Sequence, residues 1–345
     1  MNKFKYYSII VPSFNRHDEI QDLIESFTKL DFPCNRFELI IADDGSTDGT
    51  KDLVLEYQNK TELSIHFYSQ KNQGPGAARN MGMEKGKGDF FIFIDSDCTV
   101  TPHWLSVIDN MLNKENADAF GGPDSYKDDF PPLLKAINYS MTSFITTGGI
   151  RGHNKKKLGK FYPRSFNMGL SREVYNQIGG FGSLRHGQDI EYSHRIIMAG
   201  TKVISIPNAF VYHKRRTSIK KFFRQVFNWG VARINLYKID KTMLELVHIL
   251  PAVATVILLL ILIGSLLNIP VWLIAKFLLL AGFLILLLSG IHAMAKYKNI
   301  KLALLVPIVM SIQILGYGLG FITAFFLRIV LKRETFVGFR KKYYK

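Results

Sequence analysis

Asp95-Ser-Asp97 places two carboxylates two residues apart, directly after an apolar run. Carboxylates this close repel each other unless a cation lies between them. A hard divalent ion such as Mg²⁺ or Mn²⁺, completed by phosphate oxygens and water, would satisfy both and make a nucleotide diphosphate a better leaving group. The pattern therefore predicts a metal–phosphate site. The alternative is a strand-end turn in which Asp97 caps the next helix.

Polar clusters also follow two other apolar runs, VPSFNR at residues 11–16 and DDGSTDGT at residues 43–50. A glycine-rich turn, GPGAARN at residues 74–80, leads into a helical pattern. Its free backbone N–H groups and Arg79 are suited to meet phosphate or a base edge. Each cluster alone also fits an ordinary turn or helix start, so their joint placement is what indicates a site.

The elements that must position these clusters alternate between strand and helix patterns. Expected strands cover residues 7–11, 38–42, 64–68 and 89–94, and expected helices cover residues 18–30, 50–59 and 76–85. This alternation predicts an α/β fold with a parallel sheet and right-handed crossovers. Such sheets bind ligands at the carboxyl ends of their strands, which is where the polar clusters fall.

The charge of the 345-residue chain is unevenly distributed. Residues 1–150 carry 14 basic and 22 acidic side chains, whereas residues 151–241 carry 19 and 4. Because the basic excess lies beside long uncharged runs, it indicates anionic lipid rather than nucleic acid as the partner.

The composition excludes two classes of protein. A hydrophobic content of 48% excludes a disordered chain. The two cysteines, Cys34 and Cys98, are too few for a disulfide scaffold and suggest a reducing compartment.

The C-terminal part predicts about three membrane spans. Residues 246–275 contain no Asp, Glu, Lys or Arg, and after Lys276 the next charge is Lys296. A turn-like GSLLNIP at residues 264–270 separates two lengths of about 20 residues, the length that crosses a bilayer. A third uncharged segment, 302–327, contains Pro307 and three glycines, which leaves one kinked span or a re-entrant hairpin. No cleavable signal peptide is expected, so the N-terminal part is predicted to be cytoplasmic.

Residues 217–239 predict an amphipathic helix. Its apolar positions recur at i, i+3 and i+4: Ile219, Phe222, Phe223, Val226 and Phe227. Lys220, Lys221 and Arg224 lie on the other side. The pattern predicts a helix in the headgroup plane, and the alternative is a helix that faces a protein core.

These motifs, together with NMG at 167–169, GGFG at 179–182 and QDIE at 188–191, occur in the order seen in family 2 glycosyltransferases. The resemblance covers roughly residues 5–240 and implies a GT-A, Rossmann-like fold. Within the family the chain looks most like membrane-attached enzymes of bacterial exopolysaccharide assembly, of the succinoglycan glucosyltransferase type.

The resemblance implies roles for individual residues. The nucleotide-sugar pocket would be formed by Pro12, Ser13, Asn15, Asp43, Asp44, Arg79, Asp95 and Asp97. An aspartate of the DDG turn would meet the base or ribose, Asp95 the sugar or ribose, and Asp97 the metal. The metal site would consist of Asp97, Asp95 and His213. The alternative for His213 is an ordinary interfacial histidine without a metal.

Asp189 matches the catalytic base of the family's Glu-Asp motif, although Gln188 stands where that glutamate is usual. In an inverting transfer one carboxylate must take the proton of the attacking hydroxyl. Glu191 is the reserve base, and helix capping is the alternative role for Asp189. Arg215 or Arg216 would stabilise the leaving group.

Processive members hold the acceptor with Gln-x-x-Arg-Trp, of which this chain keeps Gln225 and Trp229 but has Asn228 in place of Arg. We therefore expect transfer of a single sugar. Region 124–164, with Lys155, Lys156 and Lys157, is either an acceptor loop or a solvated segment.

The sequence thus predicts a catalytic domain at 1–215, an interfacial helix at 216–241, membrane helices at 242–331 and a basic tail at 332–345. We expect a multi-pass enzyme of the inner (plasma) membrane that needs Mg²⁺ or Mn²⁺ and moves sugar from a UDP- or GDP-sugar to a hydroxyl of a polyprenyl-linked glycan. Membrane lipids are expected partners and nucleic acid is not. The alternatives are a polyprenyl-phosphate sugar synthase and a catalytically silent subunit of a polysaccharide assembly complex.

Overall fold

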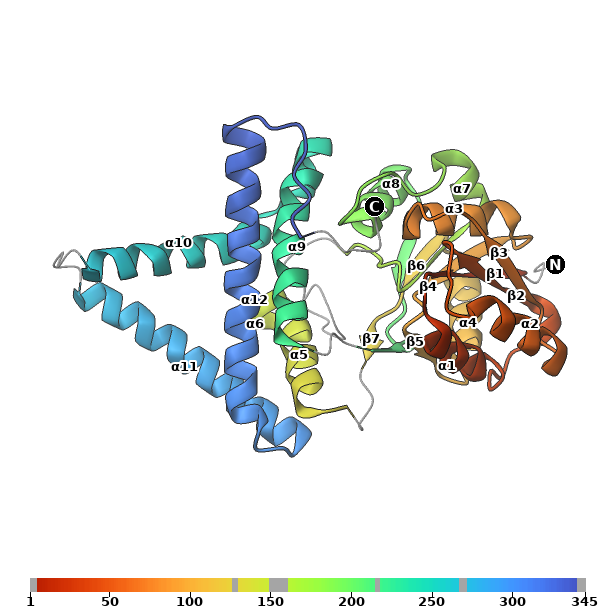
Figure 1. Ribbon diagram of the computed structural model, residues 1–345, viewed down its shortest axis with the longest axis horizontal. Helices are drawn as coiled ribbons and strands as arrows, with labels where there is room; N and C mark the ends of the chain where they lie inside the picture. Colours follow the sequence, from red (N-terminus) through yellow and green to blue (C-terminus); the bar gives the residue numbers. More distant parts are fainter. Residues whose placement is uncertain (1–4, 126–129, 149–160, 215–217, 267–271, 340–345) are drawn as a thin grey trace. The chain divides into compact units, whose positions relative to one another are not determined.

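The computed structural model describes residues 5–125, 130–148, 161–214, 218–266 and 272–339 (Figure 1). These residues divide into two compact units. The sheet unit contains residues 5–125 and 162–214, and the helical unit contains the remaining described residues. The helical unit thus includes residues 130–148, which lie inside the range expected for the catalytic domain.

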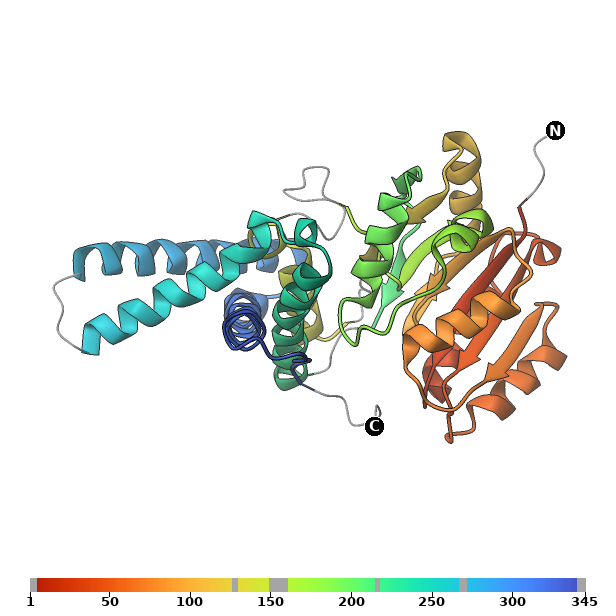
Figure 2. The same ribbon diagram turned by 90° about the horizontal axis from the view of Figure 1, so that it is seen from above.

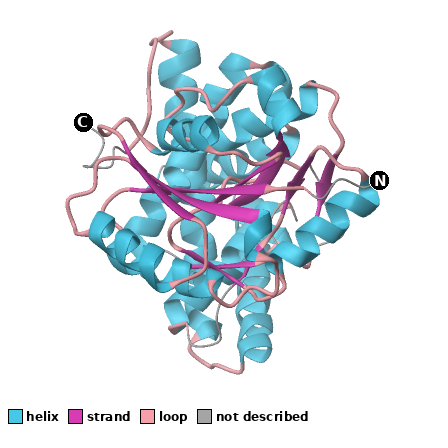
Figure 3. Ribbon diagram, turned by 90° about the vertical axis from the view of Figure 1, so that its right-hand side faces the viewer, coloured by secondary structure: helices cyan, strands magenta, loops and turns pink. Residues whose placement is uncertain are grey.

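The sheet unit is built on a seven-stranded sheet of order β3-β2-β1-β4-β8-β6-β9, twisted as Figure 3 shows. Its strands are β1 (Tyr7–Ser13), β2 (Phe37–Asp43), β3 (Ile65–Ser69), β4 (Phe90–Ile94), β6 (Ala119–Gly121), β8 (Asn167–Ser171) and β9 (Val203–Ser205). The first four strands are mutually parallel, as predicted. β8 runs antiparallel to both β4 and β6, so the sheet is mixed and the prediction of a wholly parallel sheet is wrong.

Helices connect the strands and cover both faces of the sheet (Figure 2). They are α1 (His17–Phe27), α2 (Thr50–Lys60), α3 (Pro75–Lys85), α4 (Trp104–Glu115), α7 (Arg172–Ile178) and α8 (Gln188–Met198). The expected helices at 50–59 and 76–85 are confirmed to within a residue. α1 ends at Phe27, three residues before the expected boundary.

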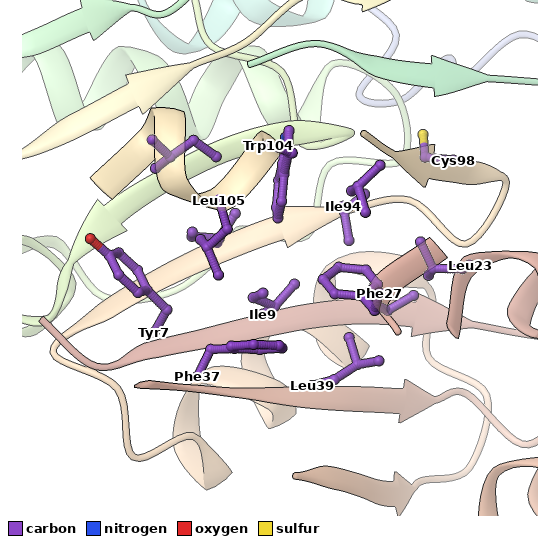
Figure 4. Packing of buried hydrophobic residues seen from close by; sticks show 14 of the residues in the cluster. Tyr7, Ile9, Leu23, Phe27, Phe37, Leu39, Ile94, Cys98, Trp104 and Leu105 are labelled. Atoms are coloured by element: carbon purple, nitrogen blue, oxygen red, sulfur yellow. The ribbon is translucent and has the colours of Figure 1, made fainter. Parts of the chain in front are cut away.

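The core lies on both sides of the sheet because successive strand residues point to opposite faces. In β1, Ile9 belongs to one apolar cluster and Ile10 to the other. The larger cluster includes Trp104, whose ring meets Phe27 edge-on at 6.0 Å (Figure 4). Burial on both faces explains why β4 is a continuous apolar run and why β1 and β2 are mostly apolar, with Ser8 and Glu38 as their internal polar residues.

A second, three-stranded sheet in the sheet unit was not predicted. It consists of β5 (Cys98–Val100), β7 (Asp124–Ser125) and β10 (Val211–His213), in the order β5-β10-β7. β10 pairs antiparallel with β5 and parallel with β7. Strands of two or three residues carry too little periodicity to be recognised from sequence.

The helical unit contains α5 (Pro132–Thr142), α6 (Phe144–Thr147), α9 (Ile219–Ile239), α10 (Leu246–Leu266), α11 (Trp272–Tyr297) and α12 (Leu302–Phe325). Three segments are long and apolar enough to cross a membrane: Leu246–Ser265, Ala275–Tyr297 and Leu302–Val330. The third is one continuous helix that ends in a π-helical turn at Phe326–Val330. The re-entrant hairpin is therefore wrong, because Pro307 and the glycines are accommodated within the helix.

α9 packs closely along α12, and Figure 1 shows the two helices side by side. A Cβ on Gly230 would lie 2.1 Å from the carbonyl oxygen of Tyr317, and one on Gly320 would lie 2.0 Å from that of Phe227. The two backbones therefore approach each other closely at these glycines, which have no side chain to keep them apart, as in tightly packed membrane helices. Phe222 and Val226 are buried in this unit, which fits the core-facing alternative. Location in the headgroup plane stays a prediction.

α5 packs on α11 and α12 through an apolar cluster and three polar contacts. Ser140 donates a hydrogen bond to Gln313 at 2.8 Å, and the Tyr139 hydroxyl lies 2.9 Å from His292 Nδ1. Asn138 donates to the Tyr297 hydroxyl at 3.3 Å. This part of region 124–164 is therefore a packed helix and not a solvated segment. Lys155, Lys156 and Lys157 lie outside the described residues.

Gly320→Ala is expected to destabilise the helical unit by about 1–3 kcal/mol, because the new methyl group would overlap the backbone of α9. Gly282→Ala on α11 is the matched control, since a Cβ there meets nothing within 4 Å. The measurement is the apparent melting temperature of the detergent-solubilised chain. Equal melting temperatures for the two variants would contradict the close approach of α9 and α12.

Candidate active site

The polar ends of β1, β2 and β4 lie at one edge of the sheet, as the sequence predicts. Ser13 pairs with Asp43 in the register of β1 and β2. β4 is parallel to β1, with Ile10 opposite Phe93, so Asp95 follows at the same edge. Parallel strands end together, which brings three clusters far apart in sequence into one region.

Asp44 is 2% exposed and holds the loop that leads into α3. Its Oδ1 accepts hydrogen bonds from the Gln70 side chain at 2.9 Å and the Gln73 N–H at 2.8 Å. Its Oδ2 accepts one from the N–H of Gly74, the N-cap of α3, at 2.7 Å. Both carboxylate oxygens are therefore used within the fold.

Asp43 differs from Asp44 in having one oxygen without a partner. Its Oδ2 accepts hydrogen bonds from the N–H groups of Gly45 and Ser46 at 3.0 Å and from the Ser69 hydroxyl at 2.8 Å. Its Oδ1 is buried without a hydrogen-bond partner among the described residues, and so is the Ser13 hydroxyl oxygen. Buried polar atoms are normally paired, so these two atoms are candidates for ligand contacts.

Asn15 links the polar cluster after β1 to the polar cluster after β2 through hydrogen bonds. It has a positive φ of 52°, its Oδ1 accepts a hydrogen bond from the Thr47 N–H at 2.8 Å, and its own N–H donates to Ser46 at 2.8 Å. Pro12 is buried within β1 opposite Ala42. Pro12 and Asn15 thus shape the edge of the sheet.

Asp48 joins the same turn to the start of α1. Its Oδ2 accepts a hydrogen bond from the His17 N–H at 2.9 Å, and its Oδ1 accepts one from the Thr50 hydroxyl. Burial raises the pKa of Asp48, but the hydrogen bonds from Thr50 and His17 outweigh burial and hold the pKa below its usual value. The carboxylate is therefore kept ionised at the N-terminus of α1, where negative charge is favourable.

Arg79 and Asp95 form an ion pair. Arg79 is 5% exposed, its Nη2 lies 2.6 Å from Asp95 Oδ1, and its guanidinium lies 5.4 Å from the centre of the Phe181 ring. Asp95 is therefore neutralised by an arginine. This pairing removes the repulsion from which a cation between Asp95 and Asp97 was inferred.

Asp97 belongs to a different group, with Cys98 and His213. Their ligand atoms all lie within 4.8 Å of one another, and Asp97 Oδ1 lies 3.2 Å from His213 Nε2. Two donors on one ion are separated by about 3–4 Å, so this set of oxygen, sulfur and nitrogen fits a metal ion after a small adjustment. Asp95 is outside this group. Cys98 was not singled out from the sequence, although it directly follows Asp97.

Asp189 lies in the first turn of α8, 3.4 Å from Arg164 Nη1 through its Oδ2. The N-cap of this helix is Gly187, with a φ of 82° and no side-chain cap, so helix capping is not the role of Asp189. A Cβ on Gly76 would lie 2.1 Å from the Gln188 amide nitrogen, so the start of α8 lies against the start of α3. Nothing in the sequence marked Arg164, which is 25 residues from Asp189.

Glu191 has a structural partner. Its two oxygens lie 2.6 and 3.2 Å from the Arg195 guanidinium, which also donates hydrogen bonds to the carbonyl oxygens of Ile178 and Gly180. The pair therefore holds the GGFG segment against α8. A carboxylate occupied in this way is poorly suited to the reserve role of general base.

The remaining predicted residues are outside the sheet unit or outside the described residues. Gln225 and Trp229 lie on α9 in the helical unit, one turn apart. Arg215 and Arg216 lie outside the described residues. Gln225 and Trp229 are therefore not part of the geometry of the sheet unit described above.

Residues 8–179 match a family model described as Glycosyl transferase family 2. Glycosyltransferase AglE of Haloferax volcanii is 25% identical over 242 residues, which cover 68% of this chain and 77% of AglE. GalNAc(5)-diNAcBac-PP-undecaprenol beta-1,3-glucosyltransferase of Campylobacter jejuni is 34% identical over 115 residues, which cover 33% of this chain and 37% of that enzyme.

Among solved structures, the mannosyltransferase PcManGT from Pyrobaculum calidifontis, in complex with GDP-Man and Mn²⁺, has the same fold. It is 16% identical, and the superposition covers 90% of this chain and 88% of that chain with a TM-score of 0.60. At this identity the similarity concerns the fold alone.

Asp44→Asn is expected to destabilise the sheet unit by about 1–3 kcal/mol more than Asp43→Asn. Both oxygens of Asp44 accept hydrogen bonds from N–H groups, so the side-chain NH₂ of an asparagine at this position would face an N–H donor. At position 43 the NH₂ of the asparagine can instead take the place of Oδ1, which has no partner among the described residues. Chemical unfolding of the two variants measures the difference. Equal losses would show that the two carboxylates carry equal structural roles.

Proposed function

The chain belongs to glycosyl transferase family 2, and from this premise we propose that it transfers one sugar from a nucleotide-diphosphate sugar to a hydroxyl group of a polyprenyl-linked glycan, with inversion at the anomeric carbon. One observation carries the proposal. Asp43, at the edge where β1 and β2 end, keeps a buried carboxylate oxygen without a partner among the described residues. Asp97, which follows β4 at that edge, lies with Cys98 and His213 in a group of possible metal ligands, and α8, which carries Asp189, begins against the start of α3.

Asp43 is proposed to bind the nucleobase. Uracil and guanine each carry a ring N–H group, and a buried carboxylate oxygen without a partner is a strong acceptor for it. The Ser13 hydroxyl, buried opposite Asp43 in the strand register, is available to the same ligand. Asp44 supports this contact indirectly, because its oxygens hold the neighbouring loop. These contacts suit UDP- and GDP-sugars alike.

Asp97 and His213 are proposed to hold a divalent ion next to the donor diphosphate, with the Arg79–Asp95 pair beside the sugar or ribose. Such an ion would supply positive charge against the departing diphosphate. Two observations support this proposal. The oxygen, sulfur and nitrogen atoms of Asp97, Cys98 and His213 lie close enough together to bind one ion. A diphosphate leaving group also needs positive charge beside it.

Asp189 is proposed to act as the general base. The acceptor hydroxyl oxygen forms a bond to the anomeric carbon, its proton passes to Asp189, and the bond from that carbon to the diphosphate oxygen breaks to release the nucleoside diphosphate. Arg164 holds one oxygen of Asp189 in place, which leaves the other for the acceptor. Glu191 is less suited to this role, because both of its oxygens pair with Arg195.

The acceptor and the membrane location rest on the relatives and on the helical unit. The Campylobacter jejuni enzyme is named for an undecaprenol-linked acceptor. The three apolar helices suit a multi-pass protein of the inner membrane. Lys296 at the end of α11, and Lys298 and Lys301 before α12, favour a cytoplasmic position for that turn and for the catalytic domain. Gln225 and Trp229 on α9 are proposed to contact the acceptor.

Asp189→Asn is expected to lower sugar transfer by about 10²–10⁴-fold while nucleotide binding stays unchanged, because the amide cannot take the acceptor proton. Release of UDP or GDP from a panel of donors, with lipid extract as acceptor, measures transfer. Glu173→Gln is the control, since Glu173 is an exposed acid in the first turn of α7.

An active Asp189→Asn variant would overturn the hydroxyl acceptor. It would favour a polyprenyl-phosphate sugar synthase, whose ionised acceptor needs no base. Absence of nucleotide binding by the wild-type protein would instead favour a catalytically silent assembly subunit.

Asp43→Asn is expected to weaken binding of UDP and GDP by at least about tenfold, since an amide N–H₂ would face the ring N–H of the base. Titration calorimetry measures the dissociation constant. Asp52→Asn on the exposed face of α2 serves as control and should bind as the wild type does. Unchanged affinity of the Asp43 variant would remove the base contact from the proposal.

A further inference from the structure

The small sheet β5-β10-β7 brings together, from all three of its strands, side chains of types that can bind metal ions or orient a ligand. Cys98 opens β5, His213 closes β10, and Asp124 opens β7. Asp97 directly precedes β5. Residues about 25 and 115 positions apart along the chain thus meet in one place, and strands this short cannot be predicted from sequence pattern.

Cys98 lies on the His213 side of this sheet. The two residues are directly opposite each other in the antiparallel pair of β5 and β10. Side chains of directly opposed residues project from the same face of a sheet. Figure 4 shows Cys98 at the margin of the large apolar cluster, and its sulfur lies within 4.8 Å of the ligand atoms of Asp97 and His213.

The two ring nitrogens of His213 face two different carboxylates. Nε2 lies 3.2 Å from Asp97, and Nδ1 lies 3.5 Å from Asp124, which is 4% exposed. Histidines that bind metal characteristically direct the second nitrogen to a carboxylate, which orients the ring and raises its basicity. This arrangement is independent of Cys98 and also indicates a metal centre.

We propose that Cys98 is a third protein ligand of the ion held by Asp97 and His213, and that its sulfur makes the site select a thiophilic ion such as Zn²⁺ or Co²⁺ over Mg²⁺. Mg²⁺ strongly prefers oxygen ligands in octahedral geometry. Thiolate and imidazole donors favour later divalent ions. The inference rests on the proposed metal site, and it concerns which ion that site takes.

Three protein donors of this kind match zinc sites that keep one coordination position for a substrate. The fourth position would suit a diphosphate oxygen of the donor. Asp124 is then a positioning residue, since it acts through the ring of His213. Binding requires the thiolate, so the Cys98 proton is released to solvent when the ion enters.

The test is Co²⁺ titration of the full chain in detergent, followed by absorption spectroscopy. A thiolate ligand produces a near-ultraviolet charge-transfer band, whereas oxygen and nitrogen ligands alone do not. The chain has two cysteines, so Cys34→Ser is the matched control. We expect the band in the wild-type protein and in Cys34→Ser and its loss in Cys98→Ser.

The outcome does not depend on whether Cys98→Ser folds. A band that survives in Cys34→Ser assigns the sulfur to Cys98 by elimination, and a wild-type protein without the band overturns the proposal. So does a band that disappears in Cys34→Ser or persists in Cys98→Ser.

Competition for bound Co²⁺ tests the selectivity. Zn²⁺ should displace Co²⁺ at concentrations at least about 100-fold lower than Mg²⁺ needs, in keeping with the order of affinities of divalent ions at nitrogen and sulfur donors. Equal displacement by Mg²⁺ would overturn the selectivity. Sugar transfer by a protein that shows no charge-transfer band would leave the proposed function intact and overturn the assignment of Cys98 as a ligand. A band in a protein that binds no nucleotide would support Cys98 as a ligand and overturn the proposed function.

Discussion

The geometry of the sheet edge depends on how α3 is attached to it, and the buried carboxylate of Asp44 makes that attachment. Asp44 accepts the N–H of Gly74, the residue that caps α3. α3 in turn presents Arg79 to Asp95 and clamps the GGFG segment through Asn80, whose side chain exchanges two hydrogen bonds with the backbone of Phe181. Loss of one buried acceptor would therefore disturb residues far apart in sequence.

The carboxylates of this edge divide into two kinds, and the division follows from the cost of burying charge. Asp44, Asp95 and Glu191 each have their charge met by N–H groups or by an arginine. Asp43 keeps one buried oxygen without a partner among the described residues, and Asp97 lies in a group of metal-ligating atoms. A buried carboxylate oxygen without a partner among the described residues is costly, and this cost is the reason that we propose a ligand contact for Asp43.

The helical unit combines close backbone contact with polar contacts in an otherwise apolar environment. Gly230 and Gly320 let α9 and α12 approach, while Ser140 on α5 donates a hydrogen bond to the buried Gln313 on α12. Polar groups within apolar helices are costly unless they are paired. α5 supplies that pairing, although its segment lies between strands β7 and β8 of the sheet unit. The chain therefore passes between the two units more than once.

The features of this protein that depend on local pattern could be predicted from its sequence. Strand-like segments predicted β1 to β4, helical periodicity predicted α2 and α3, and uncharged length predicted the three apolar helices, because each signal is complete within one segment. Motif order indicated the family, and the resemblance nominated Asp43, Asp97 and Asp189 as site residues.

The features that depend on contacts between distant segments became visible only in the folded structure. It distinguished Asp43 from Asp44, paired Asp95 with Arg79 and Asp189 with Arg164, and joined Cys98 to His213 through a sheet of very short strands. It also placed α5 with the apolar helices. A carboxylate's role depends on which donors surround it, and those donors come from other elements of the fold.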